Sequence, residues 1–597
     1  MRTPKLHPAL VYPSIVFAVI FVAIFLLHAP LLQLPYFWDE AGYYVAAARD
    51  LLLTGSLIPH TTVSNAHPPL VMAWVALWWK VAGYAPLVTR SAMLVVSAFS
   101  LLGLFRLAQR AANTEVAIAS TLCTALYPVF FAQSSLAQVD LAAAGLTFWA
   151  LCAYLEDRPV AVAAWFSLAA LAKETAILAP LALAAWELVR VVALRVLRKR
   201  WTEETWLEAN WPVEKVESHA RPNRSLIPLL VPLVPLVVWY VYHYARTGYV
   251  FGNPEFFRYN VAATLSPLRV FLALAARLWQ TFGYMHLWVL TLAMLLAMLL
   301  PPIRDDGEKE NQASETDHGG TGALARPVAP GSTALASATT AGRQPIPITV
   351  QMVFYVVIAA YVAALALIGG AVLARYMLTA VPLVIIVAVS TLRRRLRYWP
   401  AVIAVVACAF ILGWFWNPPY GFSPEDNLAY RDFIVLHQDG ERFLEARYPM
   451  ARALTAWPAS DELTSPWLGY VTRPMKVVRI EDFSLEQVLS AAEVRDKFDV
   501  ALVFSTKYEP AHPMLDKWRR WTKLKAKYFG FHRDLPPAAA AQILGGHIVF
   551  SEERKGQWIA VIEMEKSEMQ NAETGSSFGS FIIWRDENLP RPQSSLR

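Results

Sequence analysis

Three acidic side chains stand where apolar stretches end and could act as bases. Asp39 and Glu40 follow the first apolar run within the aromatic stretch 38–44, and Asp140 follows the polar stretch 133–139. A carboxylate in such a place could take a proton from an acceptor hydroxyl or amine. As a structural alternative, Asp39 caps a helix that ends near Gly55, and Asp140 caps the helix that it opens. We take Asp39, Glu40 and Asp140 as catalytic candidates.

Basic side chains stand beside apolar stretches as well. Charges in or next to membrane spans are costly, which makes each one a functional candidate. Lys173 and Arg375 lie between apolar runs, Tyr376 follows directly, and Arg90 opens another run. Cations facing an external cavity suit a phosphate through their charge and multiple donors. Snorkelling of the long side chains to the interface is the alternative.

His67 precedes two prolines and could bind a phosphate, a proton or a metal. Proline at a helix start is ordinary structure, so the dipeptide itself indicates only a helix N-terminus. Asp39, Glu40 and His67 could together hold a divalent metal, although their spacing in sequence is not diagnostic. Which metal, if any, these residues bind stays open.

The composition and the apolar runs predict which structural elements position these residues. The chain has 597 residues, of which 56% are hydrophobic and 17% charged, whereas soluble domains carry roughly 25% charged residues. Uncharged runs recur as far as residue 416, and a span needs ~20 apolar residues. In lipid such runs must be helices, and they lack the alternation of barrel strands. We therefore predict a polytopic α-helical membrane protein.

Basic clusters orient the spans, because cytoplasmic loops are rich in Lys and Arg. This rule also accounts for the net charge of +7. We find no basic patch with interleaved aromatic residues in the sequence, the pattern typical of nucleic-acid binding. We expect a cytoplasmic N-terminus, an external loop at 35–86, and about eleven spans within 1–416. The run 69–81 is short and rich in Trp, which predicts a helix lying on the external surface. We assign to the cytoplasm the clusters Arg2/Lys5, Arg106/Arg110, 190–200 and Arg393/Arg394/Arg395/Arg397.

Three further segments complete the expected organisation. The polar insert 201–224 is expected in the cytoplasm, and 301–347 should be a disordered cytoplasmic linker. Residues 417–597 mix charge with short strand-like runs and helix-like segments, which indicates a soluble α/β domain. Span parity puts this domain outside, in the periplasm of a bacterial-type inner membrane. The expected strands are 451–457, 476–480, 500–505, 548–550 and 558–562, with helices near 426–444 and 485–497.

The order of the motifs resembles the GT-C glycosyltransferases that use polyprenyl-phosphate sugars. Among these it is similar to the protein O-mannosyltransferases and the lipid A aminoarabinose transferases. The resemblance covers roughly residues 10–416. It rests on Asp39-Glu40, His67-Pro68-Pro69-Leu70, Asp140, Lys173-Glu174, and Arg375-Tyr376-Met377-Leu378 followed by Pro382.

The resemblance implies roles for individual residues. Asp39 stands where the family has its base, and Asp140 would be a second acid that binds the acceptor or positions the donor. Lys173 and Arg375 would contact the donor phosphate, with inversion at the anomeric carbon. His67 matches the protein-mannosylating version, whereas the aminoarabinose version carries a lysine there. The external loop 252–257 matches neither version.

These observations predict a glycosyltransferase that moves a sugar from a polyprenyl phosphate to a protein, lipid or glycan acceptor on the external face. The alternative is a transporter or flippase of a lipid-linked sugar, motivated by the same charges near the spans. Transporters often show related halves and broken central helices, and no such duplication is visible here. A non-catalytic anchor would need only one span.

Overall fold

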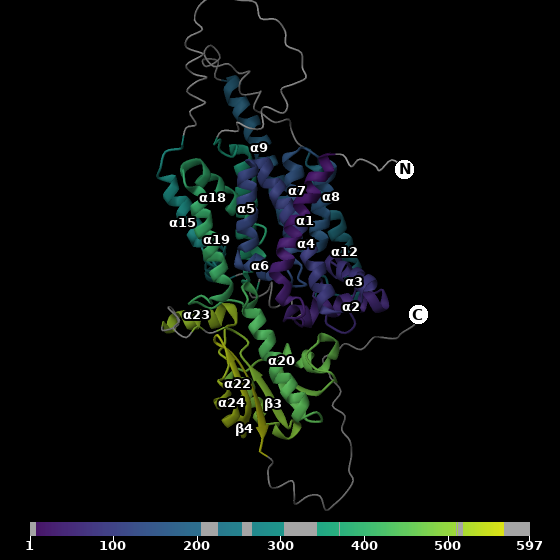
Figure 1. The fold of residues 1–597 in the computed structure, drawn as a ribbon. Helices are drawn as coiled ribbons and strands as arrows, with labels where there is room; N and C mark the ends of the chain where they lie inside the picture. The colour runs from purple at the N-terminus through teal and green to yellow at the C-terminus, as the bar shows by residue number, and fades with distance from the viewer. Residues whose placement is uncertain are drawn as a thin grey trace, which may run out of the picture.

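The computed structural model describes residues 8–203, 225–252, 266–303, 343–368, 370–508, 510 and 518–565. A bundle of helices forms one part of the molecule, and a five-stranded sheet with its helices forms the other. Figure 1 shows α20 (Ala429–Arg447) leading from the end of the bundle into the sheet. The predicted fold class, a helical membrane protein with a C-terminal α/β domain, is confirmed.

The bundle is built from helices that begin and end close to the predicted apolar runs. Proline opens several of them at the first turn, where its missing N–H costs nothing. In chain order they are α1 (Pro8–His28), α2 (Val45–Thr54), α3 (Leu70–Ala82), α4 (Pro86–Ala111), α5 (Thr114–Leu126), α6 (Pro128–Gln133), α7 (Asp140–Leu155), α8 (Pro159–Ala172), α9 (Leu178–Glu203), α11 (Ile227–Leu230), α12 (Leu233–Thr247), α14 (Pro267–Phe282), α15 (Leu287–Met298), α17 (Ile348–Leu367), α18 (Val381–Arg395) and α19 (Trp399–Phe415).

Length and composition identify the helices that could cross a membrane. Within the described residues, five helices are long and apolar enough, or six if the pair α14 and α15 counts as one span. That pair is bent by 77°, and the largely apolar sequence on both sides of the bend does not predict this break. Other apolar helices have only 10–17 residues, α3, α5, α7, α8 and α19 among them. The chain is therefore a multi-pass membrane protein, and the count of about eleven spans stays a prediction.

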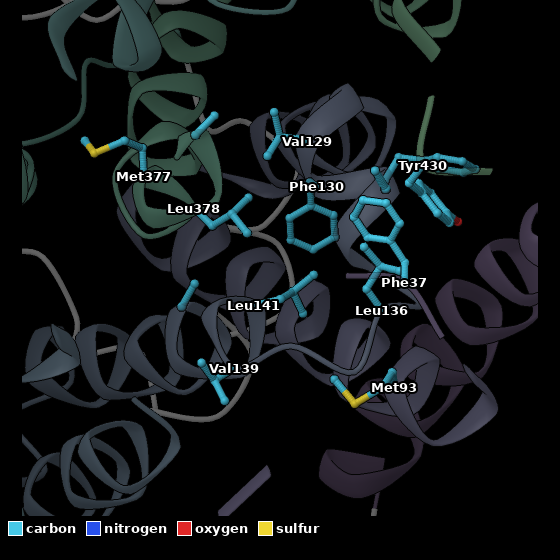
Figure 2. Packing of buried hydrophobic residues seen from close by; sticks show 14 of the residues in the cluster. Phe37, Met93, Val129, Phe130, Leu136, Val139, Leu141, Met377, Leu378 and Tyr430 are labelled. Atoms are coloured by element: carbon cyan, nitrogen blue, oxygen red, sulfur yellow. The ribbon is translucent and has the colours of Figure 1, made fainter. Parts of the chain in front are cut away.

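Helices α4 and α7 pack closely in the centre of the bundle. A Cβ atom added at Gly145 on α7 would lie 1.8 Å from Ser100 Oγ on α4. Small residues at such crossings let helix backbones approach, which is how helices associate in lipid. Figure 2 shows the apolar packing near one end of the bundle, where Phe37, Phe130 and Leu141 point into a common cluster with Tyr430 from α20.

The C-terminal sheet contains both parallel and antiparallel pairs. Its strand order is β2-β1-β3-β5-β4, with β2, β1 and β3 parallel and with β5 antiparallel to both β3 and β4. All five strands overlap the runs that the sequence predicts. Their bounds are β1 (Arg452–Ala456), β2 (Lys476–Ile480), β3 (Val500–Phe504), β4 (Gly546–Arg554) and β5 (Gln557–Met564), and the helices are α21 (Ala459–Thr464), α22 (Leu485–Ala492), α23 (Arg519–Phe529) and α24 (Pro537–Leu544).

The sheet domain docks on the loop that follows α1. Tyr470 donates a hydrogen bond to the Tyr36 carbonyl over 2.9 Å. The Trp38 and Trp457 rings meet edge to face with centroids 5.0 Å apart. At Gly42 a Cβ atom would lie 2.6 Å from the Trp457 indole. The loop is therefore held between the bundle and the sheet domain, and no larger residue fits at Gly42 without movement.

Several predictions fall on residues outside the described ranges. These are most of the insert 201–224, most of the linker 301–347, most of the loop 252–257, and the C-terminal tail. The short run 69–81 is described, and it forms the helix α3. Figure 1 shows α3 at the end of the bundle that faces the sheet domain.

Candidate active site

Arg375 is the centre of an ionic cluster at the end of the bundle that faces the sheet domain. It lies on the short 3-10 helix η6 (Ala374–Met377), between α17 and α18. Its Nη2 lies 2.5 Å from Asp39 Oδ2, and its Nε lies 3.4 Å from Asp140 Oδ2. Its Nη1 donates to Glu425 on the short 3-10 helix η7 (Pro424–Asp426). One guanidinium therefore contacts three carboxylates from three distant segments.

Lys173 adds a second cation to the cluster. Its Nζ donates to Asp140 Oδ1 over 2.5 Å and lies 3.9 Å from the centre of the Tyr376 ring. The residue follows α8 with an extended backbone, which breaks the helix before α9 begins. A cation over an aromatic face is attracted by the ring quadrupole. Asp140 thus bridges Lys173 and Arg375, and both cations are buried.

Asp39 is the member of the cluster that reaches solvent. Its side chain is 30% exposed, whereas those of Arg375 and Asp140 are each 4% exposed. The residue precedes a single π-helical turn, η2 (Glu40–Tyr44), and follows Trp38, whose φ of 45° is left-handed. π-turns and left-handed non-glycine residues cost free energy and often mark functional sites. The Asp39 carboxylate makes no capping hydrogen bond.

The structure does not place Glu40 and Arg90 in this cluster. Glu40 accepts hydrogen bonds from Arg90 Nη1 at 2.5 Å, from Phe37 N at 2.9 Å and from Ala137 N at 2.5 Å. Arg90 donates in addition to the carbonyls of Pro35 and Ser135. Both side chains are buried. The pair is therefore a structural tie between the loop and the bundle, because its donors and acceptors are already satisfied.

His67 lies beside the cluster rather than in it. Its Nδ1 is 2.9 Å from Glu174 Oε2, and its ring stacks on Tyr44 with centroids 5.8 Å apart. Within the described residues, His67, Asp39 and Glu40 do not form a group that could share one metal ion. The divalent site considered for these three residues is therefore wrong in the described structure, since each has a different charged partner.

Two acidic residues of the site were not predicted, Glu425 and Asp426. Besides Arg375, Glu425 binds Gln138, whose Nε2 donates over 2.9 Å. Asp426 accepts from the Tyr284 hydroxyl over 2.6 Å, and burial together with Glu425 raises its pKa to about 8. The signal that singled out Asp39-Glu40, an acidic pair just past an apolar run, is repeated here after α19. The sequence pattern instead predicts Asp426 at the start of the helix near 426–444.

Two buried arginines of α14 were missed as well. Arg277 donates to the carbonyls of Leu373 and Ala371, just before η6, and lies 5.5 Å from the Tyr376 ring. Arg269 donates to the Gly370 carbonyl over 3.3 Å. Both therefore hold the segment that carries Arg375. Two arginines eight positions apart in an apolar helix were the available signal, because charges in such segments need a reason.

The charges of the central cluster are almost balanced. Three carboxylates, Asp39, Asp140 and Glu425, face two cations, Lys173 and Arg375. Burial by itself lowers the pKa of Arg375, but Glu425 and Asp39 raise it well above its ordinary value. The guanidinium therefore stays charged at any physiological pH. A partly exposed base beside buried cations can accept a proton and stabilise a leaving anion in one place.

Two kinds of comparison relate the chain to known proteins. The sequence model of the family described as Dolichyl-phosphate-mannose-protein mannosyltransferase matches residues 66–207. No curated protein sequence matches the chain. Residues 66–207 include His67, Asp140 and Lys173, three of the residues on which the predicted resemblance rests.

Two solved structures whose chains follow a similar course are distant from this chain in sequence. The crystal structure of ArnT from Cupriavidus metallidurans bound to undecaprenyl phosphate is 13% identical, with 92% of this chain and 97% of that chain covered and a TM-score of 0.48. The archaeal oligosaccharyltransferase AglB from Archaeoglobus fulgidus, in complex with an inhibitory peptide and a dolichol-phosphate, is 11% identical, with 91% and 74% covered and a TM-score of 0.41. Over residues 66–207, the family match confirms the predicted resemblance to protein mannosyltransferases that use a polyprenyl-phosphate sugar.

Proposed function

We propose that this chain is a membrane glycosyltransferase that moves a sugar from a polyprenyl-phosphate donor to an acceptor on the side of the membrane that carries the sheet domain. One observation carries the proposal. The partly exposed Asp39 carboxylate contacts the buried Arg375, which shares Asp140 with Lys173. A base and two cations for a phosphate therefore stand within one cluster, at the end of an apolar bundle that a lipid carrier could reach.

The proposed reaction is a single displacement with inversion. An acceptor hydroxyl or amine attacks the anomeric carbon while Asp39 accepts its proton. The bond from the anomeric carbon to the phosphate oxygen breaks, and the polyprenyl phosphate leaves with the electron pair. Arg375 and Lys173 stabilise the negative charge that develops on that phosphate. Asp140 holds the two cations in place, since it contacts both.

The donor and acceptor to test first follow from the family match. The matched model describes mannosyltransferases that act on proteins from a dolichyl-phosphate donor, so polyprenyl-phosphate mannose and a protein acceptor are the first pair. Lipid and glycan acceptors are the second choice. Orientation in a bacterial-type inner membrane, with the sheet domain in the periplasm, belongs to the same proposal.

The decisive experiment measures sugar transfer by Asp39→Asn in membranes supplied with a labelled polyprenyl-phosphate sugar. We expect the rate to fall by roughly 10²–10⁴-fold, the usual contribution of a general base. The matched control is Asp157→Asn. Asp157 is exposed between α7 and α8, and its φ of 55° suits Asn. Transfer by Asp39→Asn close to that of the control would overturn the assignment of the base.

Transport of a lipid-linked sugar is the competing function. Reconstituted vesicles separate the two, because a flippase moves its substrate across the bilayer and forms no covalent product. The gathering of Asp39, Asp140, Lys173 and Arg375 at one end of the bundle supports the transferase, since transporter sites lie near the midplane. Movement of the lipid without any glycosylated product would favour the flippase.

A further inference from the structure

A second polar cluster lies inside the sheet domain, away from the proposed active site. His437 and Glu441 stand four positions apart on α20, so both point from the same face of that helix. Glu462 approaches them from α21. His437 Nδ1 lies 2.6 Å from Glu462 Oε2 and 3.6 Å from Glu441 Oε1. Among the residues that the structure describes, these are the one group of His, Cys, Asp and Glu with metal-ligand spacing.

The cluster is buried inside the sheet domain, and aromatic rings pack against its histidine. The three ligand candidates are 0–1% exposed. The Phe433 ring stacks on His437 with centroids 4.0 Å apart, and the Phe504 ring meets it at 4.5 Å. Three carboxylate oxygens, both of Glu441 and Oε1 of Glu462, are buried without a hydrogen-bond partner. Each such atom costs free energy unless something satisfies it.

Two carboxylates side by side in this interior need a compensating positive charge. No Lys or Arg pairs with Glu441 or Glu462 among the described ion pairs, which leave only His437. One divalent cation bound to a neutral imidazole and two carboxylates would make the group neutral and would satisfy the unpartnered oxygens.

We propose that His437, Glu441 and Glu462 bind a structural divalent transition metal, with Zn²⁺ as the first choice. A mixed set of nitrogen and oxygen donors suits Zn²⁺, whereas Ca²⁺ and Mg²⁺ prefer oxygen alone. Ligand atoms of tetrahedral zinc lie roughly 3.4 Å apart, given metal–ligand distances of ~2.1 Å. Both oxygens of Glu441 are available, so three side chains offer the four donor atoms that a closed site needs.

The metal would join elements that touch the loop bearing Asp39. Phe433, which stacks on His437, also meets the Phe37 and Trp38 rings, with centroids 5.3 and 5.5 Å away. Trp457, just before α21, meets Trp38 from the other side. We therefore expect the metal to stabilise the sheet domain and its contact with this loop, without contacting the substrate.

The test uses the full-length protein in detergent and measures metal content by mass spectrometry after incubation with Zn²⁺, Mn²⁺ or Fe²⁺ and desalting. We expect about one ion per wild-type chain and a Tm that falls by roughly 5 °C or more after chelation. Glu441→Gln should hold no metal, and its Tm should not respond to the chelator. The matched control Asp439→Asn, on the same helix, should behave as the wild type.

The proposal fails if the wild-type chain binds no metal at stoichiometric amounts, or if Glu441→Gln retains it. If Glu441→Gln does not fold, the wild-type protein decides the question alone. Calorimetric titration of the chelated protein with Zn²⁺ should then show one saturable site, and the absence of binding heat together with an unchanged Tm would mean a metal-free cluster. In that case the two carboxyl groups share a proton instead.

Discussion

The cluster around Arg375 shows why single residues of this site cannot be judged by charge alone. Asp39 and Arg375 are 336 positions apart in sequence, and Glu425 is 50 positions beyond Arg375. Glu40 and Arg90 carry the same charges as the cluster, but they bind each other and the backbone. A charged side chain whose hydrogen-bonding partners all lie inside the protein stabilises the fold. The side chain of Asp39, in contrast, is partly exposed to solvent.

Variants of the buried pair of Lys173 and Asp140 distinguish a structural role of this pair from a catalytic role. Lys173→Met should lower the free energy of unfolding by roughly 3–5 kcal/mol, because it leaves a buried carboxylate without its closest partner. The double variant Lys173→Met/Asp140→Asn should recover most of that stability, while transfer stays low because the phosphate has lost a cation. Thermal unfolding and a transfer assay on the same preparations measure both effects.

The ion pair of Arg393 and Glu115, at the opposite end of the bundle, provides the control for the variants of Lys173 and Asp140. Arg393 Nε lies 2.6 Å from Glu115 Oε2, whose side chain is 60% exposed. Because Glu115 is largely exposed, we expect this ion pair to contribute at most about 1 kcal/mol, so Glu115→Gln should change neither stability nor transfer by much. If the double variant at Lys173 and Asp140 transfers sugar at the wild-type rate, the cluster serves the fold only.

Asp426 should make the stability of the protein depend on pH. Its pKa of about 8 in the folded protein lies above the ordinary value of 3.8. Between these values the unfolded chain loses a proton that the folded chain keeps, so stability falls as the pH rises toward 8 by up to ~1.4 kcal/mol per unit. In Asp426→Asn this dependence should vanish, and the difference in unfolding free energy between variant and wild type should grow from pH 5 to pH 8. Parallel curves for the two proteins would contradict the assignment.

At the scale of elements, most of the fold could be predicted from patterns. The helices follow apolar runs, and the five strands overlap runs rich in β-branched residues. The break between α14 and α15 could not be predicted, because the run is apolar on both sides of the bend. The partners of Arg375 could not be predicted either, since they depend on how distant segments pack. Glu425 and Asp426 could have been found, because they repeat the pattern of Asp39-Glu40.

The close contact between the loop after α1 and the sheet domain requires a glycine at position 42. Gly42→Ala would place a methyl group 2.6 Å from the Trp457 indole, so the ring must move. We expect the free energy of unfolding to fall by roughly 1–3 kcal/mol, which is typical of overpacking. Sugar transfer should also be slower, because Asp39 lies three positions away. In the Gly42→Ala background, Trp457→Phe should partly restore both the stability and the transfer rate, since the smaller ring leaves room for the methyl group.

Gly421→Ala is the matched control for Gly42→Ala, because a methyl group there would meet nothing within 4 Å. Both variants add one methyl group to the chain. Thermal unfolding and transfer rates of the two should therefore differ clearly. Equal values for Gly42→Ala and Gly421→Ala would mean that the loop and the sheet domain are not tightly packed in the membrane-embedded protein.

At the scale of the whole molecule, the two ends of the bundle differ in charge and in neighbours. One end carries the Arg375 cluster and the sheet domain (Figure 1). Arg393 and Arg394 lie at the other end, where the Arg394 carbonyl accepts from Ile303 N and Arg393 pairs with Glu115 at the start of α5. By the positive-inside rule this second end should face the cytoplasm.

Cysteine labelling tests this orientation. In a background with Cys123, Cys152 and Cys408 replaced by Ala, we expect Asp439→Cys in the sheet domain to react with a membrane-impermeant maleimide in cells whose outer barrier has been opened. Asp157→Cys, in the loop between α7 and α8, should react only after the inner membrane is permeabilised. The reverse pattern would invert the proposed topology, although the geometry of the cluster would be unaffected.

The three carboxylates around Arg375 have a consequence for how a ligand enters. If the cluster binds a phosphate as proposed, the arriving phosphate would not fill an empty positive site but would displace carboxylates that already contact Arg375. Asp39 is the carboxylate that can leave most easily, because its side chain is 30% exposed, whereas those of Asp140 and Glu425 are 4% and 3% exposed. Binding of the donor would therefore release the base from its guanidinium, so that Asp39 becomes free to take a proton only when a phosphate has taken its place.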